Sequence, residues 1–506
     1  MKCLTCLFSL LILLWSSVGS AKAEPLLFRT YLSTHLSSLD PLLISRTEIL
    51  TYYNNLYRGL YRINAKGQLV VEGAIRCEWK NTKNLECELS PTHLWSNGQR
   101  VKAQEYVEAF RRFVSKDSKS LDVDLLLGLK NARAIHNGKM NAGKLGVTSH
   151  DPYHLRFQLE EPDSEFKYKL ASPLLVPVVR PHSQDQLSSQ IYNGPYVLKS
   201  WSSKALTLEP NPYFKKGHPR RPNVEILFID EEAAVINLFD ANKIHLIKRI
   251  PTIQIPKYKK QKIVFAQTVS RFDYLGFGPQ LRFDNHLTEA LIYSLDFKEF
   301  QNLFSSLGPP GCPSFSSQLL DKERCYKFNL KRAKKAYEQV SDEVKNRRYQ
   351  FFFSSSGGED LKRSAEWFQA QWKKHLGFEV DIGSMESGVY KAEVRDSPPD
   401  VFRMGFQMDR PTCLAALESF SSLSPNNFIE WKSAKFDHWL SEMAKTHNQN
   451  TKRKLCGQAL NLLLESHRLV PLGQFQFFLA LSPGFSGVYI NNLNQIDLSL
   501  LHPVSK

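Results

Sequence analysis

The N-terminal segment, MKCLTCLFSLLILLWSSVGSAKAEP, decides the compartment in which the rest of this chain must fold. Lys2 is followed by an apolar run over residues 4–15 and by small residues that end in Ala-Lys-Ala at 21–23. This pattern predicts a secretory signal peptide over residues 1–23. The apolar run is too short to cross a bilayer, which requires about 20 apolar residues. Because no cysteine stands at the expected cleavage point, we expect a periplasmic protein that is not lipid-anchored.

Six of the eight cysteines remain after this cleavage: Cys77, Cys87, Cys312, Cys325, Cys413 and Cys456. An even number in an oxidising compartment predicts disulfides, with six buried thiols as the alternative. Cys77 and Cys87 flank a segment that is typical of a turn between two strands, and Cys312 and Cys325 bracket a Pro- and Ser-rich loop. We expect these two local pairs, which leaves Cys413 and Cys456 as the third by elimination. Metal-binding spacings are missing from the mature chain, so no metal is expected.

The length and charge of the chain limit its class. Its 506 residues exceed what one hydrophobic core supports, so two or three domains are expected. The formal net charge of +16 could indicate nucleic-acid binding. The basic residues are scattered, however, with short groups at 215–221, 248–260 and 330–335. A secreted protein rarely meets nucleic acid, so we interpret these groups as solvated faces and expect no nucleic-acid partner.

Helical and strand patterns alternate along the whole chain. Apolar spacing predicts helices over 101–115, 365–377, 435–447 and 454–467, and strands over 155–160, 205–211 and 224–230. Repeats and flexible linkers are absent from the sequence. We therefore expect an α/β protein whose domains are tied by extended crossovers, which permit hinging without independent tumbling.

Catalytic motifs are missing or incomplete. The segment GKMNAGK, residues 138–144, has the spacing of a phosphate-binding loop, but Leu145 occupies the position of the metal-binding Ser or Thr. The preceding residues also read as the end of a helix, where that motif requires a strand. We interpret the segment as a polar surface turn. The motifs of serine hydrolases and zinc proteases are absent as well, so neither an enzyme nor a cofactor is expected.

A series of segments resembles one protein family in composition and in order. These segments are YNNLYRGLYR (53–62), LWSNGQRVKAQEYVEAFRR (94–112), NGPYVLKSW (193–201), LTLEPNPYF (206–214) and LRFDNHLTEALIYSLDFKEF (281–300). Together they resemble the periplasmic oligopeptide- and dipeptide-binding proteins, which are solute-binding family 5 of the ABC importers. The resemblance covers nearly the whole mature chain, and the order of the segments makes it specific.

The resemblance implies an α/β, two-lobed periplasmic binding protein fold of class II type, with an extra inserted domain and a hinge of two crossovers. Lobe one would combine residues 24–45, 190–268 and 482–506, with an inserted domain at 46–189. Lobe two would run over 269–481, and the crossovers would lie near 270–277 and 480–487.

The resemblance also implies a function. The protein would be a monomeric receptor that captures peptides in an interlobe cleft and delivers them to ABC importer permease subunits in the inner membrane. An alternative keeps the fold and changes the cargo to a cell-wall peptide, glutathione or a nickel complex.

The expected ligand site begins with DVFRMGFQMD, residues 400–409, which is similar to a family segment whose last Asp pairs with the peptide ammonium group. On this resemblance Asp409 would bind the ammonium and Arg403 a peptide carboxylate. The strand edge between them would pair with peptide backbone through Gly405, Phe406, Gln407 and Met408. One departure matters: Arg410 follows at once, and it could neutralise Asp409 in a purely structural pair.

Lobe one is expected to contribute cations and a histidine to the same site. The stretch IHLIKRIP, residues 244–251, stands where many peptide binders carry Tyr-Asn facing the ligand. Lys248 and Arg249 would then favour a carboxylate or another anion, unless both face solvent. His35 completes the expected ligand-binding set.

Overall fold

The structure is a computed structural model that describes residues 26–33, 38–43, 47–177, 190–303, 325–355, 358–473 and 476–504. The expected signal peptide, His35 and Cys312 lie outside these residues. Among the helices of the described ranges, none has both the length and the apolar character needed to cross a bilayer.

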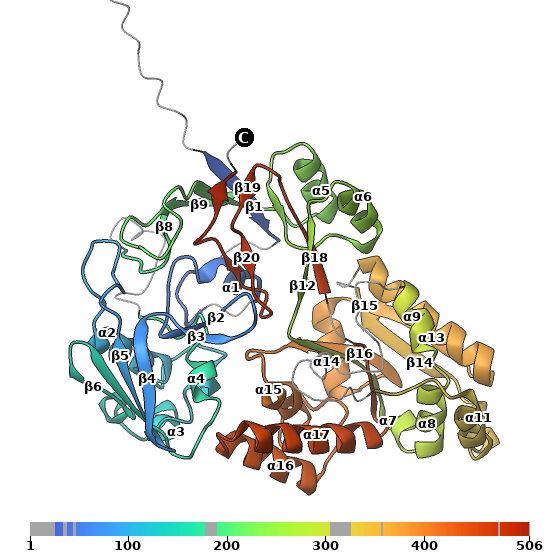
Figure 1. The fold of residues 1–506 in the computed structure, drawn as a ribbon. Coiled ribbons are helices and arrows are strands. Elements are labelled where there is room, and N and C mark those ends of the chain that lie inside the picture. Colours follow the sequence, from blue (N-terminus) through green and yellow to red (C-terminus); the bar gives the residue numbers. More distant parts are fainter. Residues whose placement is uncertain are drawn as a thin grey trace, which may run out of the picture.

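Lobe two is built on a five-stranded sheet in the order β15-β14-β16-β13-β17, with helices packed around it (Figure 1). Its strands are β13 (Arg271–Phe277), β14 (Tyr349–Ser354), β15 (Val380–Met385), β16 (Val401–Gln407) and β17 (Leu469–Pro471). Its helices are α7 (Pro279–Arg282), α8 (Asn285–Tyr293), α9 (Phe297–Leu303), α11 (Leu330–Glu338), α12 (Asp342–Lys345), α13 (Gly358–Leu376), α14 (Ser387–Asp396), α15 (Cys413–Leu417), α16 (Ala434–Lys445) and α17 (Gln449–Glu465).

Lobe one contains a four-stranded sheet in the order β1-β10-β9-β8 and a three-stranded sheet in the order β11-β18-β12. Their strands are β1 (Leu27–Leu32), β8 (Tyr196–Trp201), β9 (Ala205–Pro210), β10 (Asn223–Phe228), β11 (Leu246–Ile247), β12 (Val264–Thr268) and β18 (Gln476–Leu481). The remaining elements are α5 (Glu232–Asp240), α6 (Ile255–Lys260), β19 (Phe485–Ser486), β20 (Tyr489–Ile490), β21 (Ile496–Asp497) and β22 (His502–Pro503).

The inserted domain carries a four-stranded antiparallel sheet in the order β4-β5-β7-β6. Its elements are α1 (Thr47–Tyr53), β2 (Tyr61–Ile63), β3 (Leu69–Val71), β4 (Ala74–Asn81), β5 (Asn84–Leu89), α2 (Ala103–Phe113), α3 (Ala132–His136), β6 (Val147–Asp151), β7 (His154–Gln158) and α4 (Phe166–Lys169).

Local sequence explains why the predicted helices form. In α2 a buried stripe contains Tyr106, Val107 and Phe110, at the helical spacing that the sequence predicted. Glu105 accepts a hydrogen bond from the backbone N–H of Lys102 over 2.7 Å and so satisfies one free donor at the helix start. Helix α13 ends at Leu376, just before the glycine that the sequence marks as a stop.

Lobe one and the inserted domain share one hydrophobic core. Phe28 and Leu208 of lobe one belong to the same buried cluster as Leu85 and Tyr106 of the inserted domain. Lobe two has its own core, which runs from Phe272 to Leu472. Shared burial resists separation, so the molecule divides into two bodies for any hinge motion, and the inserted domain moves with lobe one.

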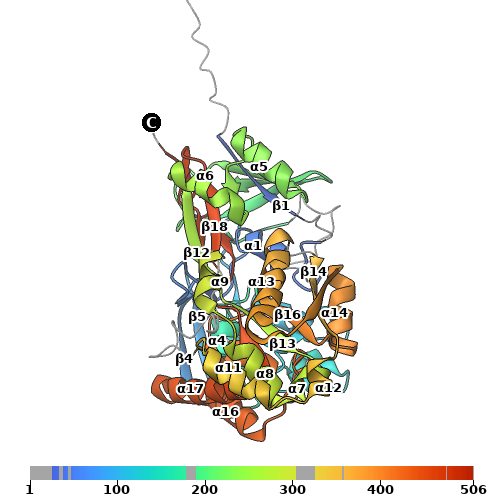
Figure 2. The same cartoon turned by 90° about the vertical axis from the view of Figure 1, so that its right-hand side faces the viewer.

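The two crossovers lie side by side as strands β12 and β18 (Figures 1 and 2). These strands pair antiparallel from Val264 opposite Ala480 to Thr268 opposite Gln476. Because the side chains of β18 pack in the cores of lobe one, the chain leaves lobe two before this strand. Strand β18 therefore packs with lobe one, and the expected domain bounds stay a prediction.

Two of the expected disulfides are present. Cys77 and Cys87 face each other in the register of β4 and β5 and are bonded. Cys413 at the start of α15 is bonded to Cys456 in α17. The remaining expected pair, Cys312 with Cys325, cannot be described, because Cys312 lies outside the described residues.

Candidate functional site

Strands β13 and β16 present a polar face near the lobe boundary. Side chains of a strand alternate between the two faces of a sheet. On one face Arg271 lies opposite Gln407, and Asp273 lies opposite Gly405. The other face is apolar, and on it Phe406 stacks against another phenylalanine of β13 with ring centroids 5.9 Å apart. Charged side chains on two interior strands make this face a candidate for binding as well as for packing.

Asp273 and Arg271 form a bidentate ion pair on this polar face. The carboxylate accepts hydrogen bonds from Nε of Arg271 at 2.6 Å and from Nη2 at 3.1 Å. Asp273 is buried, which makes this pairing necessary. A β carbon on Gly405 would lie 2.1 Å from Oδ1 of Asp273, so only glycine leaves room for the pair.

Arg403 lies buried on β16 and donates from Nη1 to the hydroxyl oxygen of Ser364 in α13 over 2.9 Å. Burial lowers the pKa of Arg403 to about 10; the carboxylate of Asp273 opposes this, and the charges of Arg271 and Arg249 add to it. Arg249 is an exposed residue of lobe one. Three guanidinium groups thus gather where the lobes meet, and an anion bound there would relieve their mutual repulsion.

The open side of β16 lies along its C-terminal half. Pairing with β14 covers only Val401 and Phe402. Within the described residues, no strand runs beside residues 404–407 on that side. The strand is therefore interior to the sheet at its start, while its end is a candidate edge for pairing with an extended segment.

The expected ligand residues Gln407 and Met408 fix the first crossover. The side-chain amide of Gln407 donates to the carbonyl of Ser270 over 2.7 Å, and the backbone N–H of Met408 donates to the same carbonyl over 2.9 Å. The side chain of Met408 is buried in the core of lobe two. Both residues thus tie β16 to the crossover that enters β13.

Asp409 forms the ion pair that the sequence left open as an alternative. Its carboxylate accepts from Nη1 of Arg410 over 2.6 Å. The side chain of Asp409 is nevertheless 44% exposed, whereas that of Arg410 is 4% exposed. Arg410 also pairs with Glu418 at 2.6 Å and with Glu165 of the inserted domain at 3.3 Å. One guanidinium is therefore shared among three carboxylates, of which Glu165 also pairs with Lys452 at 3.0 Å.

More carboxylates lie close to Asp409. Burial raises the pKa of Asp122, in the inserted domain, and the charges of Asp124 and Asp409 raise it further. Burial also raises the pKa of Glu418, an effect that Arg410 opposes and Asp409 reinforces. Both shifts come mainly from burial, and the charge of Asp409 adds to each of them.

Lys248 and Arg249, which were expected to bind ligand from lobe one, pack against different aromatic rings. The ammonium group of Lys248 lies over the rings of Tyr31, at 4.7 Å from the centroid, and Tyr52, at 5.6 Å. Lys248 thus packs on the aromatic surface of lobe one. Arg249 lies over Phe477, at 5.7 Å, and its charge acts on Arg403.

Several residues of the candidate site were not predicted from the sequence. Arg271 and Asp273 could have been found, since charged and apolar residues alternate in the SRFDYLGF segment. Asp122 and Glu165 carry no local signal, because only the docking of the inserted domain brings them to lobe two.

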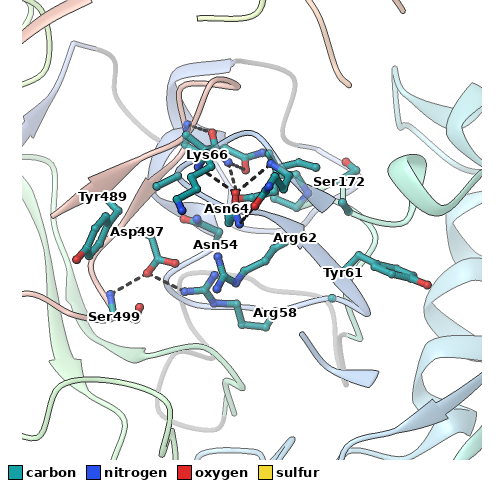
Figure 3. A pocket seen from close by; sticks show the side chains of 18 of the residues that line it. Asn54, Arg58, Tyr61, Arg62, Asn64, Lys66, Ser172, Tyr489, Asp497 and Ser499 are labelled. Atoms are coloured by element: carbon teal, nitrogen blue, oxygen red, sulfur yellow. Dashed lines mark hydrogen bonds and ion pairs between the residues drawn. The ribbon is translucent and has the colours of Figure 1, made fainter. Parts of the chain in front are cut away.

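A separate cavity of about 310 Å³ lies between the inserted domain and the C-terminal strands of lobe one (Figure 3). Two of its cations are already paired: Arg58 with Asp497 at 2.9 Å, and Arg62 with Glu72 at 2.6 Å. The cavity also lies within one of the two bodies, so hinge motion would not close it around a ligand. The boundary at β16 is therefore the better candidate. Across the described chain, no group of three or more His, Cys, Asp or Glu side chains is arranged to hold a metal ion.

Two bodies joined by paired crossovers, with charged groups at their boundary, define a hinged solute receptor. Residues 76–428 match the family model described as bacterial extracellular solute-binding proteins, family 5 Middle. The chain belongs to this family, whose members are binding proteins.

Curated relatives align along most of the chain. It is 25% identical to the probable deoxycholate-binding periplasmic protein YgiS of Escherichia coli, over 90% of this chain and 89% of that one. It is 23% identical to the periplasmic murein peptide-binding protein MppA of E. coli, over 95% and 94%. Identity to the oligopeptide-binding protein OppA of Bacillus subtilis is 24%, over 82% and 81%.

Solved structures confirm the fold. The unliganded open form of MppA superposes with a TM-score of 0.79 at 21% identity, covering 96% of this chain and 98% of that one. OppA of Haemophilus influenzae in complex with RPPGFSPFR gives a TM-score of 0.74 at 20% identity, covering 96% and 100%. The expected two-lobed binding-protein fold is thus confirmed.

Proposed function

We propose that this protein is a periplasmic receptor that captures peptides at the lobe boundary beside β16. It would close on its cargo as a monomer and deliver it to the permease subunits of an ABC importer. The named relatives that bind peptides support the cargo class. The signal-like N-terminal segment supports the location.

The separation of charge along β16 carries this proposal. At one end Asp409 shares the guanidinium of Arg410 with Glu165 and Glu418. At the other end Arg403 lies near two further guanidinium groups, those of Arg271 and Arg249, and one carboxylate, that of Asp273. A peptide is itself a dipolar molecule, with an ammonium at one end and a carboxylate at the other. Between the two ends, the open side of residues 404–407 offers backbone hydrogen bonds that do not depend on the side chains of the cargo.

The spacing of the two charged ends limits peptide length. Arg403 and Asp409 are six positions apart in the sequence. At roughly 3.3 Å per residue, six positions span at most about 20 Å. An extended peptide that engages both ends therefore contains roughly six residues or fewer.

Other cargo would use this site only in part. A bile acid, as the name of one relative suggests, offers a carboxylate to the arginines but has no cation for Asp409. A cell-wall peptide or glutathione carries additional carboxylates, and a nickel complex would need ligands of its own. The dipolar site therefore favours peptides with free ends.

Mass spectrometry of ligand co-purified with the protein tests the proposal directly. Ligand-stripped protein is then screened by thermal shift against short peptides, a murein peptide, glutathione, deoxycholate and nickel. We expect peptides to raise the melting temperature with concentration, since they bind only the folded state. Solution scattering should show a smaller radius of gyration with bound peptide. A response to deoxycholate or nickel alone would contradict the proposal.

A further inference from the structure

Glu165 of the inserted domain is buried among side chains of lobe two. It is 2% exposed and immediately precedes α4. Its Oε2 accepts from Nε of Arg410 at 3.3 Å and from the hydroxyl of Thr412, and its Oε1 accepts from Nζ of Lys452 at 3.0 Å. All three donors belong to lobe two. A buried carboxylate is thus satisfied entirely across the boundary between the two bodies.

The partner of Glu165 is also the partner of Asp409. Arg410 uses each of its three nitrogens on a different carboxylate: Nε on Glu165, Nη1 on Asp409 and Nη2 on Glu418. The guanidinium is planar and its donors have fixed directions. Its orientation therefore depends on Glu165, and the orientation of the Asp409 carboxylate depends in turn on the guanidinium.

This contact lies away from the hinge. In Figure 1, α4 approaches α15 and α17 at the lower part of the molecule, while the crossover strands β12 and β18 lie above. The same boundary contains a hydrogen bond from the backbone N–H of Ser164 to the carbonyl of Ala444, at 2.8 Å, and a ring contact between Trp79 and His447, at 5.1 Å. Opening about the crossovers separates these groups, since they belong to different bodies.

We infer that Glu165 is a positioning residue for ammonium recognition, which acts on Asp409 through Arg410 and makes that recognition depend on closure. The inference rests on the proposed function. In the open receptor Arg410 keeps only Asp409 and Glu418, and Asp409 is more completely neutralised. In the closed receptor Arg410 also pairs with Glu165. Asp409 is then less completely neutralised, and its carboxylate can pair with the ligand ammonium. By thermodynamic linkage, ligand bound at Asp409 then favours closure.

Glu165→Gln tests this inference, because it preserves shape and removes the charge. The matched control is Glu161→Gln, four residues earlier, whose side chain is 76% exposed and pairs with Lys83 inside the inserted domain. Calorimetry compares tetra-alanine with N-acetyl tetra-alanine, and solution scattering gives the radius of gyration without ligand. Glu165→Asp, which keeps the charge on a shorter side chain, serves as a second variant in case the first fails to fold.

In the wild type and in the control, we expect the free amine to bind roughly tenfold or more tightly than the acetylated peptide. In Glu165→Gln this preference should fall several-fold, and the ligand-free radius of gyration should increase. Wild-type preference together with a wild-type radius of gyration would overturn the inference. If the wild type binds tetra-alanine and N-acetyl tetra-alanine equally well, the proposal that Asp409 recognises the ammonium group is wrong. The ligand-free radius of gyration then decides alone whether Glu165 holds the two bodies together.

Discussion

Gly405 lies directly opposite Asp273 in the register of β13 and β16, and a β carbon at Gly405 would lie 2.1 Å from the carboxylate oxygen Oδ1. The buried carboxylate and its bidentate Arg271 occupy the space that any larger residue would need. The charged face of the site therefore depends on a residue that has no side chain.

Gly405→Ala should displace Asp273 and weaken its pair with Arg271. We expect a loss of about 1–3 kcal/mol in the free energy of unfolding, the usual range for overpacking. Chemical denaturation measures the change. Gly484→Ala is the control, since a β carbon there meets nothing within 4 Å. Equal stability of the two variants would show that the β13–β16 face tolerates the added carbon.

Asp409→Asn keeps the shape of the side chain and removes its charge. Binding of a free-amine peptide should weaken by about 2–5 kcal/mol, the cost of truncating one partner of a desolvated charge pair. Stability without ligand should change by less than about 1 kcal/mol, because the side chain of Asp409 is 44% exposed and the buried Arg410 keeps two other carboxylates. Calorimetry and thermal melting measure the two effects, with the exposed Asp342→Asn as control. A less stable protein with normal affinity would assign Asp409 to structure alone.

Arg403→Met should weaken binding of peptides that end in a free carboxylate. The expected loss is roughly ten- to a hundredfold, since charged hydrogen bonds contribute about 1.5–3 kcal/mol. Peptides with an amidated end should bind wild type and variant alike. Ser364→Ala, which removes the hydroxyl partner of Arg403, controls for a shift in the position of its guanidinium. Equal losses for both peptide forms would count against a carboxylate site.

Acidification should destabilise the protein through His93. Burial lowers the pKa of His93 to about 4, from an ordinary value of 6.5. Between these pH values the unfolded chain binds a proton that the folded protein does not, so the free energy of unfolding falls as the pH falls. The full effect is roughly 3 kcal/mol for one histidine, and it is absent above the ordinary pKa. Denaturation at pH 7 and pH 4.5 should show a weaker pH dependence in His93→Gln. An unchanged dependence would assign the effect to other groups.

The two disulfides should contribute unequally to stability. The chain-entropy relation gives about 3 kcal/mol for the separation of 10 residues between Cys77 and Cys87, and about 4 kcal/mol for the 43 residues between Cys413 and Cys456. Paired Cys→Ser variants and thermal melting test this order. Non-reducing peptide mapping should recover both links, and the expected pair of Cys312 with Cys325. Recovery of Cys312 and Cys325 as free thiols would contradict that pairing.

Local residue patterns were enough to predict several secondary-structure elements and the family. Helix α2 forms where its apolar spacing predicted it, because the period of a helix is written in neighbouring residues. The Cys77–Cys87 link was equally predictable, since a hairpin places its own strands in register. The order of the family-like segments predicted the two-lobed fold, because each segment marks a turn or strand at a fixed place in it.

The pairing of the charged side chains could not be predicted from local sequence, because it depends on how distant segments pack. Arg410 meets Glu165 across 245 positions of sequence, and this contact exists because the inserted domain docks on lobe two. Asp273 fits beside Gly405, which has no side chain, because β13 and β16 pair in one particular register. The chain fixes which groups are charged, while docking and register fix which of them are buried together. Charges that are buried together interact strongly, because the dielectric constant of the protein interior is low.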